Sequence, residues 1–143
     1  TDTAAAEGWN IVNEQTAEWN AEKAQQIVQS VIDAGTPFNV IYAENDDMAK
    51  GAVAALDKAN ISHGVGKDVI VMGFDCNKWA LEELKAGNWN YDGQCNPFQA
   101  SYIDDIIKKL ENGETISEKT IIMDEKGFDA TTITQEDVDN YGI

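Results

Sequence analysis

The sequence contains no arginine, one histidine and only two cysteines among its 143 residues. Because arginine binds phosphate and carboxylate groups through two parallel hydrogen bonds, its absence favours a neutral ligand. The lone histidine, His63, lies in the loop SHGVGK at the amino end of a predicted strand, where a histidine-based triad has no partner. Cys76 and Cys95 fit no metal spacing. We therefore expect neither a metal ion nor a cofactor.

Positive charge is also scarce, because ten lysines face 26 carboxylates and the formal net charge is -16. Such a chain repels phosphate backbones and anionic membrane surfaces, so we expect no nucleic-acid partner. No apolar run reaches the length of a membrane-spanning helix, and the start TDTAAAEGWN has neither a basic region nor an apolar run. Either the protein is cytosolic or a signal segment lies upstream of Thr1.

What is present is an alternation of short apolar runs and helical patterns, in a composition usual for one globular domain or part of one. Strands are predicted at 10–15, 39–44, 68–75, 89–94 and 120–123. Helices are predicted at 24–32, 48–59, 79–85 and 103–110, with a short last helix after Thr134 that Asp137 caps. This order predicts an α/β fold, a doubly wound and mostly parallel sheet with helices on both faces.

Polar and aromatic side chains follow the predicted strands, at the edge where a doubly wound sheet binds its ligands. They are Gln15, Trp19 and Asn20, then Glu44, Asn45 and Asp46, then Asp75, and finally Gln94. Amides that donate and accept, carboxylates that accept hydroxyl protons and an aromatic plate together suit a polyhydroxylated ligand. Singly, each has a plainer interpretation, such as a helix cap for Asn45, a turn former for Asp75 or core for Trp19.

Other short motifs offer no catalytic group. GVGK lacks the upstream glycine and the following Ser or Thr of a phosphate loop, and DEKGFD at 124–129 lacks the ligand pattern of an EF-hand. We therefore expect a binding protein and not an enzyme. Within the corner YAENDDMA, we expect Asn45 to face the ligand, Asp46 to cap the helix and Asp47 to face solvent in its first turn.

The stretches EWNAEKAQ, VIYAENDDMAKGAVAAL, VIVMGFD and ELKAGNWNYDGQ resemble, in order and spacing, the carboxyl-terminal portion of periplasmic sugar-binding proteins of the ribose and galactose type. The resemblance covers residues 8–143 and implies an incomplete carboxyl-terminal lobe. The amino-terminal lobe and the first strand of this lobe would lie upstream of Thr1. A monosaccharide or similar polyol would bind between the two lobes of an extracytoplasmic receptor, which would deliver it to the membrane permease of a bacterial ABC importer.

The same resemblance implies sugar contacts at four positions of this chain. They are Trp19 as the aromatic plate, Asn45 as the carboxamide of NDxMA, Asp75 as the carboxylate of GFD and Gln94 as the amide at the last strand exit. Cys76 and Cys95 depart from the family pattern. They could meet at the pocket rim and form a disulfide, or remain two buried thiols.

The resemblance further implies that the chain crosses to the other lobe after Gln94. Residues 96–123 would then pack on the missing amino-terminal lobe or on a partner chain. Without that partner the apolar face of the helix at 98–112 would be exposed and should drive self-association or swapping. The alternative function is the effector-binding lobe of a lac-repressor-type transcription regulator, which a helix-turn-helix at the start of the gene would identify.

Overall fold

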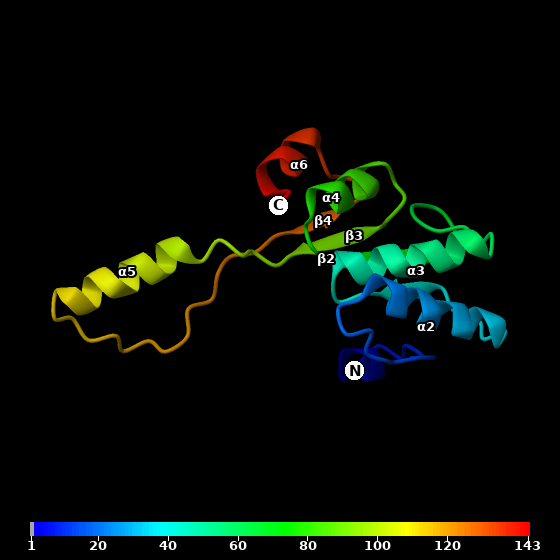
Figure 1. Ribbon diagram of the computed structural model, residues 1–143, viewed down its shortest axis with the longest axis horizontal. Coiled ribbons are helices and arrows are strands. Elements are labelled where there is room, and N and C mark those ends of the chain that lie inside the picture. The colour runs from blue at the N-terminus through cyan, green and yellow to red at the C-terminus, as the bar shows by residue number, and fades with distance from the viewer. Residues whose placement is uncertain (1) are drawn as a thin grey trace.

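The computed structural model describes residues 2–143, which build a four-stranded sheet with the order β1-β2-β3-β4. The strands are β1 (Val40–Tyr42), β2 (Ile70–Asp75), β3 (Tyr91–Gln94) and β4 (Gly127–Asp129). The helices are α1 (Asp2–Ala6), α2 (Ala21–Asp33), α3 (Asp46–Lys58), α4 (Lys78–Lys85), α5 (Ala100–Glu111) and α6 (Gln135–Tyr141). Figure 1 shows α5 standing well away from the body formed by the other elements.

The sheet is mostly parallel, as predicted. β1 pairs in parallel with β2, β2 pairs in parallel with β3, and only β4 runs antiparallel to its neighbour β3. Asp75 at the end of β2 lies opposite Gln94 at the end of β3. The exits of these two strands are therefore side by side.

The helices that contact the sheet share one face of it. α3 connects β1 to β2, and α4 connects β2 to β3, so both crossovers progress in the same direction across the sheet. Right-handed crossovers in one direction place their helices on one face. The core forms there from alanines of α3, leucines of α4 and inward side chains of the strands, including the fully buried Val71.

α2 lies against α3 at unusually short range, and Figure 1 shows the two helices side by side. The reason is Gly51 in α3, where an added Cβ would stand 2.0 Å from the carbonyl oxygen of Ala21. A larger residue at position 51 would therefore force the two helices apart. The contact brings the amino ends of α2 and α3 close together.

The second face of the sheet is open within residues 2–143. It carries an aromatic row in which the rings of Tyr42 and Phe74 lie 5.2 Å apart and those of Phe74 and Tyr91 lie 6.5 Å apart. Tyr42 is 62% exposed. A shallow hollow of about 440 Å³ on this face is lined in part by Met72 and Tyr91.

Two predicted strands are wrong. Residues 10–15 and 120–123 are irregular, and Ile122 is 88% exposed. A strand needs a neighbour to pair its backbone N–H and C=O groups, and neither segment meets one among the described residues. The last strand of the sheet is instead β4, which begins four residues after the end of the predicted segment and pairs with β3.

The predicted helix ends fared better. α2 is followed by Gly35 in the left-handed conformation, with φ of 66°. α6 begins with the predicted capping box, in which the Thr134 side chain and the Asp137 backbone N–H bond at 3.1 Å. The short helix α1 was not predicted. None of the helices in residues 2–143 is long and apolar enough to cross a membrane.

α5 forms where predicted but has no buried residue. The chain runs out from the end of β3 to α5 and returns to β4 through a long irregular segment (Figure 1). The side chains of Ile103, Ile107 and Leu110 are 48 to 55% exposed along one side of the helix. The predicted exposure of this apolar face is confirmed, and α5 does not pack on the sheet of its own chain.

Candidate functional site

Three strands and two helices bring the predicted binding residues to one edge of the molecule. β1, β2 and β3 are parallel and end at this edge, while α3 begins there directly after β1. Asn45 follows β1, Asp75 ends β2 and Gln94 ends β3. α2 begins near α3 through the Gly51 contact, which carries the turn around Trp19 to the same end.

The helix cap that was predicted for Asp46 is provided by Asn45. The side chain of Asn45 caps α3, because its Oδ1 accepts the backbone N–H of Met48 at 2.8 Å. The prediction that Asp46 caps this helix is wrong. Asp46 is fully buried and instead accepts two hydrogen bonds from Asn77, from its backbone N at 2.8 Å and its Nδ2 at 3.1 Å. Asp47 is exposed, as predicted.

Asp75 sits at a strained corner. Both Asp75 and Cys76 have positive φ, at 120° and 61°, a backbone conformation that residues other than glycine seldom adopt. Partial burial, followed by the charge of Asp47, raises the pKa of the Asp75 carboxyl. The corner between β2 and α4 is therefore held by contacts elsewhere in the fold, since its own backbone does not favour it.

Gln94 is tied to the returning chain at the point where β3 ends. Its backbone N–H donates to the carbonyl of Lys126 at 2.8 Å, and its side-chain Oε1 accepts the backbone N–H of Lys126 at 3.3 Å. The side-chain nitrogen Nε2 of Gln94 therefore remains for other partners. Gln94 and Asp75 are thus neighbours at the edge, and the side-chain oxygen of Gln94 is already used in the bond to Lys126.

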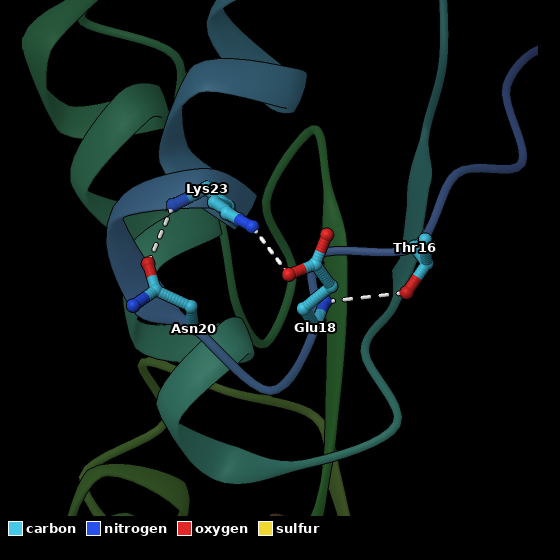
Figure 2. Close-up of polar contacts among 4 residues, drawn as sticks. All are labelled: Thr16, Glu18, Asn20 and Lys23. Carbon is cyan, nitrogen blue, oxygen red and sulfur yellow. Dashed lines mark hydrogen bonds and ion pairs between the residues drawn. The ribbon is translucent and has the colours of Figure 1, made fainter.

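Trp19 stands on an ordered turn and is 66% exposed, so the interpretation as core is wrong. Glu18 and Trp19 both adopt left-handed φ, at 52° and 58°. Figure 2 shows the polar contacts that hold the turn: Thr16 Oγ1 accepts the Glu18 N–H at 3.2 Å, and Asn20 Oδ1 accepts the Lys23 N–H at 2.9 Å. Lys23 Nζ also contacts Glu18 Oε2 at 2.5 Å.

A buried pair of carboxyls lies behind this edge and was missed by the sequence reasoning. Asp46 from the first turn of α3 and Asp92 from β3 are both fully buried and interact through their side chains. Burial raises the pKa of Asp92 most, followed by the charge of Asp46, and burial also raises the pKa of Asp46. An acidic residue within the strand YDGQ was the available signal.

The two cysteines are free. Cys76 is buried beside Asp92, with its Sγ 3.9 Å from Asp92 Oδ1, whereas Cys95 is exposed. Burial and the neighbouring carboxylates raise the pKa of the Cys76 thiol, so it is an unreactive group. The disulfide is absent, and Cys95 is not a buried thiol either. Among residues 2–143, no cluster of His, Cys, Asp and Glu has the arrangement of a metal site.

The sequence matches known proteins over most of its length. A family model described as a periplasmic binding protein domain matches residues 2–114. The fructose import binding protein of Bifidobacterium longum is 31% identical over 132 residues, which are 91% of this chain and 38% of that protein.

Solved structures agree with the sequence match. A solute-binding protein of an ABC transporter from Actinobacillus succinogenes, with bound D-allose, superposes with a TM-score of 0.78 at 30% identity, over 97% of this chain and 47% of that one. A galactofuranose binding protein superposes with a TM-score of 0.82 at 24% identity, over 96% and 46%, which supports the fold. The chain spans less than half the length of each of these proteins. It belongs to the periplasmic binding protein domain family.

Proposed function

We propose that the chain is part of the solute-binding component of a bacterial ABC importer and binds a monosaccharide or related polyol. The observation that carries this proposal is the meeting of parallel strand exits at one edge, with Asp75 and Gln94 in register and Asn45 following the adjacent strand. Family membership supports it, as do the sugars named for the relatives. Those relatives are named as binding proteins of import systems, so the effector lobe of a transcription regulator is not favoured.

Each residue would supply a different contact to the sugar. Asp75 offers carboxylate oxygens to sugar hydroxyls, and the Nε2 group of Gln94 is a donor left over from its bond to Lys126. Asn45 has its Oδ1 in the helix cap, so its Nδ2 group is the one available. The exposed ring of Trp19 would stack on the apolar face of the sugar. No step of bond making or breaking is part of this function.

The whole protein would clamp its ligand between two bodies. In this proposal residues 1–143 are the carboxyl-terminal lobe, and 96–123 packs on the amino-terminal lobe or on a partner chain. The exposed apolar face of α5 supports such a partner, because a face of this kind costs about 25 cal/mol for each Å² left in water. Closure over the sugar would present the liganded form to a membrane permease on the outer side of the membrane.

A thermal-shift screen of the full-length protein against a panel of monosaccharides and polyols tests the function. We expect one sugar to raise the melting temperature of the wild type and of Asp105→Ala, a matched control in which an exposed carboxylate of α5 is removed. The same sugar should give little shift with Asp75→Ala. A sugar that stabilises all three proteins equally would exclude Asp75 from the site, and a panel without any shift would contradict the function.

A further inference from the structure

The buried carboxyls of Asp46 and Asp92 leave a specific hydrogen-bonding problem. Oδ2 of Asp46 accepts two bonds from Asn77, but its Oδ1 receives no donor. Oδ2 of Asp92 also receives no hydrogen bond, and because this atom is buried, water does not supply one. Two carboxylates whose free oxygens face a dry interior cannot both carry a charge at low cost, because each charge would lack a partner. One proton held between the two carboxyls removes both problems.

The strands are built to admit this pair. An added Cβ on Gly73 in β2 would stand 2.5 Å from Oδ1 of Asp46 and 2.7 Å from the ring of Trp89. Only glycine therefore leaves room for the Asp46 carboxyl at this place in the sheet. Trp89, two residues before β3, lies beside the same glycine as Asp46 Oδ1 and is itself 2% exposed.

The pair is joined directly to the corner that carries Asp75. Asn77, two residues after Asp75, is held by both of its bonds to Asp46. Cys76, between them, has its Sγ beside Asp92. The positive-φ backbone of Asp75 and Cys76 is thus held by two buried carboxyls, that of Asp46 in α3 and that of Asp92 in β3.

We propose that the Asp46–Asp92 carboxyl pair, holding one shared proton, is a positioning device that keeps the Asp75 corner in its binding conformation. The inference rests on the proposed function for its effect on sugar affinity. Neither carboxyl touches the ligand, since both are buried behind the edge. When the shared proton is lost, two adjacent charges repel, the hold on Asn77 weakens and the corner relaxes away from the geometry that its strain opposes.

The surroundings do not neutralise a second charge. The titratable groups that face the pair are Asp75 and Cys76 at the end of β2, and Asp47 lies beyond Asp75 in the first turn of α3. Each is either an acid or a neutral thiol. Burial and the charge of Asp75 raise the pKa values of both carboxyls, while a backbone contact from Cys76 lowers that of Asp92. The net upward shift agrees with a retained proton at neutral pH.

Infrared spectroscopy and amide hydrogen exchange test the device without any ligand. We expect the wild type at neutral pH to show the carbonyl stretch of a protonated, buried carboxylic acid, and Asp92→Asn to lack it. In the wild type, the exchange rate of the Asn77 backbone amide should rise with pH more steeply than its intrinsic exchange rate does. In Asp92→Asn this excess should vanish, because the introduced side-chain amide can donate a hydrogen bond to Asp46 at every pH. Equal excess exchange in both proteins overturns the proposal.

Sugar titrations then test the consequence for binding, with the sugar found in the thermal-shift screen. We expect affinity of the full-length wild type to fall by about tenfold between neutral and alkaline pH, a usual size for coupling between two sites. Asp92→Asn should lose most of this dependence and bind as well as the wild type at neutral pH. Affinity that changes equally with pH in both proteins overturns this inference, whereas a wild type that binds no sugar at any pH overturns the proposed function itself.

Discussion

At the scale of single residues, the carboxyl of Asp92, together with that of Asp46, makes the stability of the fold depend on pH. Burial first, and then the charge of Asp46, raises its pKa from 3.8 to about 8. Between these two values the native state keeps a proton that the unfolded state has released. The free energy of unfolding must therefore decrease as pH rises through this window and level off above it.

Thermal unfolding of wild type and Asp92→Asn across this pH range measures the effect. The melting temperature of the wild type should fall as pH rises from about 5 to about 8, and that of Asp92→Asn should fall much less. Asp129 and Asp137 do not interfere, because hydrogen bonds from Thr131 and Thr134 lower their pKa values and their contributions are lost only in more acidic solution. Parallel curves for the two proteins would refute the assignment to Asp92.

Asn45 should contribute to stability through its cap as well as to binding. Replacing it by alanine removes the acceptor for the Met48 N–H and should lower the free energy of unfolding by about 1 kcal/mol. Asn45→Ser keeps an oxygen at the capping position and should be close to the wild type. Urea denaturation of the two variants gives the comparison, and an alanine variant as stable as the serine variant would contradict the cap.

Residue roles at this corner were only partly predictable from the sequence. In NDDM, three consecutive residues favour a helix start, and a shift of one position exchanges the cap with a buried carboxylate. Asp46 accepts its bonds from Asn77, which is 31 residues away, so no local pattern could reveal it. By contrast, the position of Asp75 at a strand end followed from the apolar run VIVMGF that precedes it.

At the scale of elements, the contact between α2 and α3 depends on Gly51. In an isolated helix, alanine at this position would be favoured over glycine by about 1 kcal/mol. Here the added Cβ meets the Ala21 carbonyl at 2.0 Å, so Gly51→Ala should instead destabilise the chain by about 1–3 kcal/mol.

Chemical denaturation of Gly51→Ala, with Ala54→Gly of the same helix as a control for helix propensity, decides the sign. The control should lose stability simply because glycine is a poor helix former. A Gly51→Ala protein more stable than the wild type would mean that the two helices can separate at no cost, against the close approach described above.

Elements whose pattern could be satisfied locally were the ones predicted well. α2, α3 and α6 carry their own side-chain caps, α5 carries a periodic apolar face, and all four formed. The failures at 10–15 and 120–123 are apolar runs whose pairing depends on a neighbouring strand, and the sequence does not say whether one is there. β4 was missed because three residues, GFD, are too short for an alternating pattern to be visible.

At the scale of the whole molecule, the unpartnered face of α5 should govern association. Two chains can bury their α5 faces against each other, so we expect the 143-residue chain to sediment as a dimer or larger species at high concentration. Ile107→Lys should shift it toward the monomer, while Lys109→Glu, on an exposed position of the same helix, should not. Sedimentation velocity measures both, and a wild type that remains monomeric at every concentration contradicts the expectation.

The chain leaves the sheet for α5 and returns to it at almost the same point, because the backbone N–H of Gln94 donates to Lys126 and that of Asn96 to the Glu125 carboxylate at 2.7 Å. In topological terms the excursion is an insertion with adjacent ends. It could be excised and the gap closed by a short glycine turn, since joining ends that already touch requires little loop entropy. The remaining, smaller protein would keep all four strands of the sheet and lack α5 with its exposed apolar face.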